Sequence, residues 1–544
     1  MLIGRLRRAL ASRLAGALPE VAAPEAASLV LNPAPAHVRA DLSLPFPMQA
    51  AKLLKRKPLD LAAELAGSLK DIPELESVEA APPGFLNLRL SAAALGEDLS
   101  SALAGGAAPG TLPAGAPRRV LLEFVSANPT GPVHVASGRA ATLGDSLARI
   151  LRRRGHEVAT EYYVNDAGKQ VRMLGLSVQA RFEQAQGRSC EVPEGGYQGE
   201  YVKELAAAAP AEASGWEASD FGRFAVGRML EAHRRDMEAF GVRFDRWFLE
   251  SELHACGAVE KTLAALRSLG HVYEKEGAVW LGSSAMEAED DKDRVLVRAD
   301  GRPTYFLADI AYHQDKLERG FAELIDIWGA DHHGYVPRMQ AAVEALGRPK
   351  GTLTIIIHQL VHLFRGKEAV KMSKRAGEFV TLAELVREAG LDACRFFFAL
   401  RGANVHMNFD LELAKRQSQE NPVYYVQYVH ARIRSIFREA ESRGLRSAPE
   451  RWALLGEESE RALLVKLAWF PEALSVCERE LSPHPLASYL MELAGLYHPF
   501  YERCRVVDEG AKELSEARLA LCAGTASVIQ DGLGLLGVSA PEKM

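Results

Sequence analysis

Ala127-Asn-Pro-Thr-Gly-Pro-Val-His-Val-Ala-Ser137 joins an apolar run to a helical pattern. The run before it, residues 120–125, has the length and continuity of a buried strand. After it, apolar residues recur at helical spacing as far as Leu151, and Gly131-Pro132 lets the chain turn between the two elements. The turn therefore follows the carboxyl end of a strand. In parallel sheets ligands bind there, and the N–H groups of a helix start can hold a phosphate.

The same alternation of strand and helix patterns continues to about residue 405. Alternation of this kind predicts a doubly wound parallel sheet. The expected strands are residues 120–125, 158–164, 278–281, 295–298, 324–328 and 353–357.

The chain divides into three predicted domains, joined by a Gly- and Pro-rich linker after the first. Within the first domain, helical patterns cover residues 47–54 and 59–69, and strand patterns cover 27–31 and 84–90. The fold class is multidomain α/β: a Rossmann-like domain with an N-terminal α/β domain and a C-terminal all-α domain. The predicted boundaries are 1–103, 118–408 with an insertion at roughly 180–295, and 409–544.

Composition narrows the class of protein. With 544 residues, 48% of them apolar, the chain can bury several cores. Its net charge of -6 means that a nucleic-acid partner would need local basic patches. The six cysteines form no Cys-x-x-Cys pair, which argues against a thiolate zinc site and fits the reduced thiols of the cytoplasm, where we expect the protein. No apolar stretch approaches the ~20 residues of a membrane span, so no membrane contact is expected.

A second segment offers phosphate chemistry. The familiar Gly-x-Gly-x-x-Gly and P-loop signatures are missing. Val370-Lys-Met-Ser-Lys-Arg-Ala-Gly377 instead places Lys371, Lys374 and Arg375 on a loop that ends in glycine. Such a loop can neutralise the charge that develops on a leaving pyrophosphate. From these residues alone, a basic surface turn is the alternative.

Taken in order, His134-Val-Ala-Ser137 and Lys371-Met-Ser-Lys-Arg375 resemble the HIGH and KMSKS motifs of class I aminoacyl-tRNA synthetases. Flanking stretches narrow the resemblance to the arginyl-tRNA synthetases over nearly the whole chain. These stretches are residues 84–90, 123–132, 161–168, 197–201, 305–309, 328–333 and 421–428. The chain departs from the family at Ala136 and Ser137, where glycine and a second histidine are usual. A methyl group restricts close approach, and serine carries no imidazolium charge.

The resemblance implies ligation of L-arginine to its tRNA through arginyl-adenylate, with ATP, Mg²⁺ and release of pyrophosphate. It gives catalytic roles on the phosphates to His134, Lys371 and Lys374. It implies ATP contacts from Ser137, Gly138, Asp331, His332 and Met372. The rival interpretation is a catalytically impaired, synthetase-like regulatory protein that binds arginine or tRNA, in which Ala136 and Ser137 have ended catalysis.

The resemblance also implies an arginine pocket. A guanidinium presents a planar fork of donors that carboxylates satisfy best. Tyr305 and Asp309 would share one face if their stretch opens a helix. With them, the resemblance assigns Asn128 to the α-amino group and Glu123 to the completion of the pocket.

The C-terminal domain resembles the family's anticodon-binding domain, so tRNA(Arg) is the expected macromolecular partner of a monomer. Tyr497 and Tyr501, one helical turn apart, could stack on unpaired bases or pack in the core. Met544 could pack beside the same bases. No metal site of the protein's own is expected: Asp331-His332-His333 is a polar turn rather than a metal pair, and His358 and His362 are packing histidines.

Overall fold

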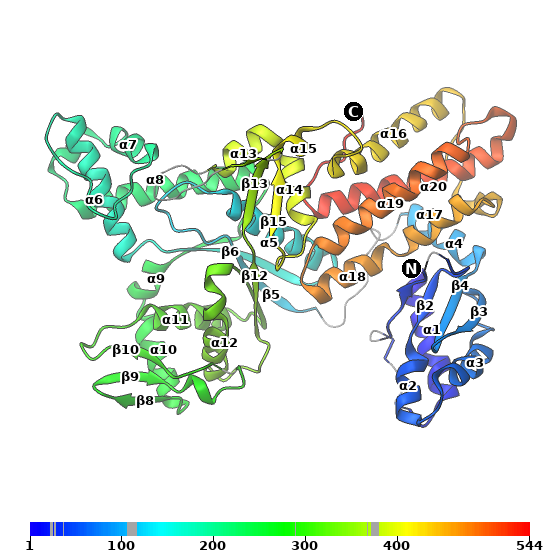
Figure 1. Ribbon diagram of the computed structural model, residues 1–544, viewed down its shortest axis with the longest axis horizontal. Coiled ribbons are helices and arrows are strands. Elements are labelled where there is room, and N and C mark those ends of the chain that lie inside the picture. The colour runs from blue at the N-terminus through cyan, green and yellow to red at the C-terminus, as the bar shows by residue number, and fades with distance from the viewer. Residues whose placement is uncertain are drawn as a thin grey trace.

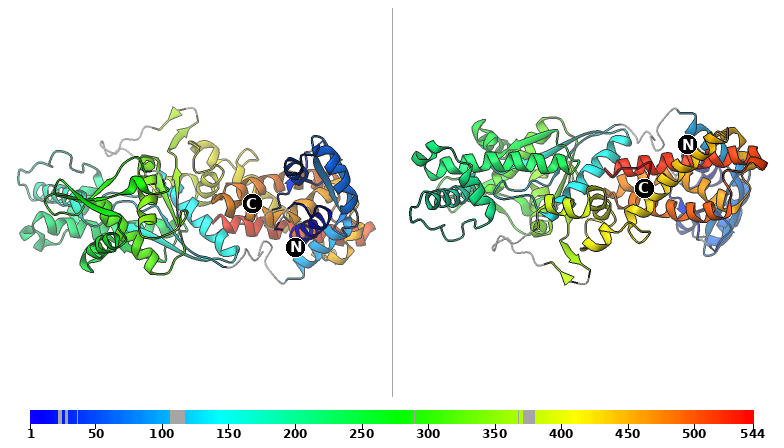
Figure 2. Two further views of the ribbon diagram at one scale, coloured as in Figure 1. Left: turned by 90° about the horizontal axis from the view of Figure 1, so that it is seen from below. Right: turned by 90° about the horizontal axis from the view of Figure 1, so that it is seen from above.

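The computed structural model describes residues 1–21, 25–26, 29–35, 37–105, 117–288, 290–366, 368–370 and 380–544. Lys371, Met372 and Lys374 therefore lie outside the described residues. The helical C-terminal domain lies between the central α/β domain and the small N-terminal domain, and the molecule is elongated in both views of Figure 2. No helix of the described chain is both long and apolar enough to cross a membrane.

The central domain is built on a five-stranded parallel sheet of order β12-β11-β5-β6-β7. Its strands are β5 (Arg119–Phe124), β6 (Glu157–Val164), β7 (Arg246–Leu249), β11 (Glu323–Gly329) and β12 (Leu353–His358). The chain runs outward from β5 through β6 to β7 and then returns to β11 on the other side of β5. The order reverses between β5 and β11, and doubly wound folds bind ligands outside the carboxyl ends of two such strands. The predicted fold class is confirmed.

Two predicted strands do not belong to this sheet. Residues 278–281 and 295–298 correspond to β9 (Ala278–Leu281) and β10 (Arg294–Val297), which form a separate antiparallel sheet with β8 (Val272–Lys275). Glu276 and Gly277 both have positive φ, of 53° and 73°, and make the two-residue turn of the β8–β9 hairpin. The prediction that these two strands join the parallel sheet is therefore wrong, because the Glu276-Gly277 turn pairs β9 with β8 in an antiparallel hairpin.

Helices pack on the parallel sheet directly or on one another around it. They are α5 (Val135–Arg153), α9 (Glu250–Ala255), α10 (Ala258–Ser268), α11 (Tyr305–Glu318), α12 (Val336–Ala345), α13 (Leu382–Ala389) and α14 (Leu391–Ala399). A third small sheet holds β13 (Val361–Arg365), β14 (Glu368–Ala369) and β15 (Met407–Asp410). Between β6 and β7, α6 (Gly168–Ala185), α7 (Glu200–Ala207) and α8 (Ala218–Ala239) project sideways and enclose a core of their own (Figure 1).

The N-terminal domain has a four-stranded antiparallel sheet of order β1-β2-β4-β3. Its elements are α1 (Leu2–Ala17), β1 (Asn32–Pro33), β2 (Leu42–Leu44), α2 (Phe46–Leu54), α3 (Pro58–Leu69), β3 (Leu75–Ala81), β4 (Phe85–Leu90) and α4 (Ala92–Leu103). The strand expected at 27–31 is instead the short β1. Residues 27 and 28 lie outside the described chain.

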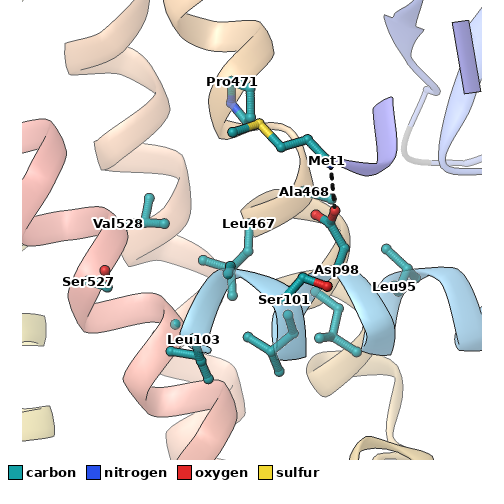
Figure 3. A pocket seen from close by; sticks show the side chains of 14 residues that line it. Met1, Leu95, Asp98, Ser101, Leu103, Leu467, Ala468, Pro471, Ser527 and Val528 are labelled. Atoms are coloured by element: carbon teal, nitrogen blue, oxygen red, sulfur yellow. Dashed lines mark ion pairs between the residues drawn. The ribbon is translucent and has the colours of Figure 1, made fainter. Parts of the chain in front are cut away.

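The C-terminal domain is helical, as predicted, with α15 (Leu411–Lys415), α16 (Pro422–Ser442), α17 (Glu458–Ala468), α18 (Phe470–Glu480), α19 (His484–Arg503) and α20 (Lys512–Leu535). Helix α4 packs against it and leaves a largely apolar cavity of about 220 Å³ (Figure 3). Leu95, Leu467 and Val528 line this cavity, and Asp98 at its side accepts the Leu2 N–H at 2.6 Å.

A buried guanidinium joins the helical domain to the sheet domain. Arg395 of α14 donates to the carbonyls of Leu536 (2.9 Å) and Phe240 (3.0 Å) and pairs with Asp145 of α5. Gly537, with φ +68°, lies so close that a Cβ would stand 2.4 Å from the guanidinium. The ends of α8 and α20 therefore meet α5 at one charged side chain.

Candidate active site

The turn after β5 is strained. Val125 and Ser126 have φ of 72° and 39°, in the left-handed region that a β-branched residue rarely adopts. The Ser126 hydroxyl donates to Glu123 Oε1 (2.9 Å) and accepts the N–H of Tyr163 (3.1 Å), which holds the turn. Strain of this kind is concentrated at functional sites, and here it lies at the switch point of the sheet.

His134 is the N-cap residue of α5 and is half-buried. It pairs with Thr381 in an isolated antiparallel bridge, and the Leu382 N–H donates to the Val133 carbonyl at 2.9 Å. The residues that directly follow the cationic segment are therefore fixed beside the turn that carries His134. This contact supports the prediction that the two segments meet.

Ser137 and Gly138 lie in the first turn of α5, and both are buried. A Cβ on Gly138 would stand 2.5 Å from Leu382 Cδ1 and 3.3 Å from a ring carbon of Phe398. The glycine predicted to contact ATP thus permits the close packing of α5 on α13 and α14. Ser137, with an exposed fraction of 6%, is enclosed at the same interface region.

A cavity of about 210 Å³ opens at the carboxyl ends of β5 and β11. Three predicted residues, Glu123, Asp309 and His332, meet in its wall. The sequence analysis did not assign further residues of the lining, which come from β6, α11, β11 and the turn after it. They include Tyr163, Tyr312, His313, Trp328 and Tyr335. His358, expected only as a packing histidine, also lines the cavity from the end of β12.

Helix α11 begins at Tyr305, as predicted, and Asp309 follows one turn later. Asp309 Oδ2 accepts the Tyr335 hydroxyl at 2.6 Å. Burial raises the pKa of Asp309 to about 6, although the bond from Tyr335 opposes the shift. Tyr305 is 61% exposed, with its hydroxyl close to Gly168, and it does not line the cavity.

Glu123 already forms an ion pair with a buried lysine. Lys316 Nζ lies 2.6 Å from Glu123 and 2.9 Å from Asp326, and His313 Nε2 lies 2.9 Å from Asp326. Burial raises the pKa of Glu123, whereas for Asp326 the charges of Lys316 and His313 outweigh burial and lower the pKa to about 2. Lys316 thus already compensates the charge of Glu123, which braces the floor of the cavity.

Glu250 is a carboxylate that the sequence analysis did not single out. It is 5% exposed, accepts the Tyr163 hydroxyl at 2.9 Å, and burial raises its pKa. Its charge contributes to the raised pKa of Asp309, so the two carboxylates lie near each other, although Glu250 does not line the cavity itself. Glu250 directly follows β7, and recognition of that strand would have placed it at the carboxyl edge of the sheet.

The remaining predicted contacts are more exposed. Asn128 donates to Gln170 Oε1 at 2.7 Å, and Asp331 lies 3.6 Å from its neighbour His332 at the sheet edge. His358 ends β12 and His362 lies in β13, so the pair is not on a helix. Burial, with the charge of Arg139, lowers the pKa of His358 to about 4.

The predicted anticodon residues differ in burial. Tyr497 is 1% exposed and packs against Phe500, so its expected stacking on bases is wrong: it lies on the core face of α19. Tyr501 is half-buried beside Arg432, whose guanidinium carbon lies 4.6 Å from the ring centroid. Met544 is 52% exposed.

Comparisons with known proteins agree with this architecture. Family models match for the arginyl tRNA synthetase N terminal domain (residues 5–90), the catalytic domain of class I (R) tRNA synthetases (99–207) and the DALR anticodon binding domain (426–544). The arginine–tRNA ligase of Elusimicrobium minutum is 51% identical over 519 residues, which cover 94% of this chain and 95% of that protein. The corresponding protein of Bacillus subtilis is 45% identical over 527 residues, covering 95% and 94%.

A solved structure of Thermus thermophilus arginyl-tRNA synthetase superposes with a TM-score of 0.80 at 27% identity, covering 99% of this chain and 100% of that one. The relatives match the chain across all three domains, at identities far above those that reflect the fold alone. The chain therefore belongs to the arginine–tRNA ligase family.

Proposed function

We propose that this protein joins L-arginine to its tRNA in two steps, through arginyl-adenylate. The observation that carries the proposal is the acidic cavity at the β5–β11 switch point, together with the bridge between His134 and Thr381 at the start of α5. A synthetase-like protein that only binds its ligands is not favoured, because the cavity retains its carboxylates and the relatives are ligases.

Asp309 binds the guanidinium of arginine, with Glu250 close by. Asp309 is half-buried and Glu250 is buried, and among the described residues neither forms an ion pair with a lysine or arginine, whereas Glu123 is paired with Lys316. Tyr305 joins them from outside the cavity lining, and Asn128 holds the α-amino group. Glu123 acts indirectly, because its ion pair with Lys316 holds the floor of the cavity in place. Citrulline, which lacks the charge, would leave Asp309 unpaired and is rejected for that reason.

In the first step the carboxylate of arginine attacks the α-phosphorus of ATP, and the bond to pyrophosphate breaks. His134 stabilises the charge on the α-phosphate, and Lys371 and Lys374 stabilise the leaving pyrophosphate. Asp331 and His332 hold the ribose, and Met372 and the backbone near Ser137 border the adenine. In the second step a ribose hydroxyl at the 3′ end of the tRNA attacks the arginyl carbonyl and releases AMP.

Mg²⁺ would arrive with the nucleotide, and among the described residues no group of three or more His, Cys, Asp or Glu side chains is arranged to hold a metal ion. Mg²⁺ commonly binds through phosphates with few protein ligands, and it would offset the charge of the triphosphate. We further propose that the enzyme works as a cytoplasmic monomer, with the helical domain reading the anticodon through Tyr501 and Met544.

The test is arginine-dependent exchange of pyrophosphate into ATP, measured with and without tRNA(Arg). We expect exchange with arginine and tRNA and none with lysine or citrulline. The absence of exchange despite tight binding of arginine would favour the non-catalytic alternative. Exchange driven by another amino acid would overturn the assignment of the pocket.

A further inference from the structure

Two buried side chains outside the cavity hold the backbone of the turn between β5 and α5. Tyr162 of β6 is fully buried; its hydroxyl accepts the Ala127 N–H at 3.1 Å and lies 3.0 Å from the Ala127 carbonyl. His233 of α8 is also fully buried, with Nδ1 3.0 Å from the Tyr162 hydroxyl and Nε2 2.7 Å from the Gly131 carbonyl. One chain of hydrogen bonds therefore links Ala127 to Gly131 through two other elements.

The protonation of this chain follows from its partners. The Gly131 carbonyl only accepts, so Nε2 of His233 carries the proton. Burial lowers the pKa of His233, which favours the neutral ring with an unprotonated Nδ1. The single proton of the Tyr162 hydroxyl then faces two acceptors, the Ala127 carbonyl and Nδ1 of His233, each at 3.0 Å. The Tyr162 ring is fixed by Trp247, stacked at 4.2 Å between centroids, and by Phe244, edge-on at 5.2 Å. The hydroxyl is therefore aimed before any substrate binds.

The turn needs such partners because it leaves the sheet. After the left-handed residues Val125 and Ser126, the backbone of 127–131 forms no strand ladder, and buried backbone polar groups require partners. Tyr201 of α7 supplies another, since its hydroxyl donates to the Thr130 carbonyl at 2.8 Å. Two of these three side chains come from α7 and α8, helices of the insertion that projects to the side of the sheet (Figure 1).

We propose that Tyr162 and His233 are positioning residues for adenylate formation, because they fix residues 127–131 so that Asn128 and His134 meet arginine and ATP in one geometry. The inference rests on the proposed function. The proposal gives the insertion of α6, α7 and α8 a part in catalysis, because α8 holds the turn of residues 127–131 in place although no residue of α8 lines the cavity.

The test compares Tyr162→Phe with Tyr489→Phe in the full-length enzyme with tRNA(Arg). Tyr489 is a matched control, because it is also buried and its hydroxyl also donates to a backbone carbonyl, that of Lys466 at 2.7 Å, but it lies in the helical domain. We expect Tyr162→Phe to lower the kcat of pyrophosphate exchange by about 100-fold, as small misplacements of reacting groups do. Tyr489→Phe should leave kcat within about twofold of the wild type, since it touches no active-site group.

His233 offers a second measurement. In His233→Gln the side-chain amide can still donate to the Gly131 carbonyl, whereas His233→Leu cannot. We expect His233→Gln to keep kcat within about tenfold of the wild type and His233→Leu to match Tyr162→Phe, because both break one chain. The KM values for arginine and ATP should change less than kcat in every variant.

The proposal is overturned if Tyr162→Phe lowers kcat no more than Tyr489→Phe does, or if His233→Gln is as impaired as His233→Leu while both are folded by circular dichroism. If His233→Leu does not fold, Tyr162→Phe and His233→Gln decide the matter. A wild-type enzyme without exchange activity would instead refute the proposed function, so the two failures are distinguishable.

Discussion

Asp309→Asn should weaken arginine binding far more than ATP binding. Asp309 Oδ2 accepts the Tyr335 hydroxyl, and within the described part of the chain Oδ1 accepts no hydrogen bond, so it is available to a guanidinium. Removing one partner of a buried, hydrogen-bonded charge pair costs about 2–5 kcal/mol. In kcat/KM for arginine this corresponds to a loss of about 30-fold to several thousandfold.

In the wild-type enzyme, a low pH should also weaken arginine binding, because it removes the charge of Asp309 without a mutation. Arginine pairs with the ionised form of Asp309, and burial holds the pKa of that carboxyl at about 6. At pH 5 only about one molecule in eleven carries the ionised form, so the KM for arginine should be about tenfold higher than at pH 7.5. The KM rises as the pH falls because protonation of Asp309, whose pKa is raised to about 6, removes the charge with which arginine pairs.

The assay is pyrophosphate exchange at varied arginine and at varied ATP, with Asp331→Asn as the control. Asp331 is exposed and assigned to the ribose, so its variant should change the KM for ATP and leave that for arginine intact. An Asp309→Asn enzyme whose KM for arginine stays within threefold of the wild type would refute the reasoning. So would an arginine KM that is flat between pH 5 and 7.5.

Three further outcomes are expected. Tyr335→Phe removes the donor that favours the charged carboxylate, so the pH at which the KM for arginine rises should move upward, as read from the same pH series. Lys316→Met strands two buried carboxylates and should lower the free energy of unfolding by about 3–5 kcal/mol, measured in urea. Gly138→Ala drives a methyl group against Leu382 and should cost about 1–3 kcal/mol in the same measurement, with a fall in kcat because that contact holds the bridge to His134.

The sequence predicted the elements that carry strong local signals. The run before residue 127, the turn and the amphipathic α5 each agree with the tertiary structure, so the switch point could be located in advance. Tyr305 and Asp309 were assigned to the arginine pocket by the family resemblance, on the condition that their stretch opens a helix, and α11 does begin at Tyr305. The four-residue β7 was missed because it is too short to show a period, and Glu250 was missed with it.

Contacts between residues that are far apart in the sequence could not be predicted from any local pattern. Lys316 neutralises Glu123 across 193 positions, and no spacing rule indicates which carboxylate of a pocket is already paired. Tyr497 shows the opposite limit: an aromatic residue at helical spacing fits a core face and a base-stacking face equally well, and only the packing of α19 decided between them. Burial and pairing, rather than residue type, separate the binding groups from the structural ones.

Arg395 has a mechanical consequence for any tRNA that the protein charges. The Arg395 guanidinium is enclosed by the ends of α8 and α20 and by Asp145, so a hinge movement that separates these groups while the side chain stays buried would leave its charge unpaired. These contacts therefore oppose a change of angle between the helical domain and the sheet domain. We expect a bound tRNA to adapt its own shape in order to reach both the anticodon-binding domain and the adenylate.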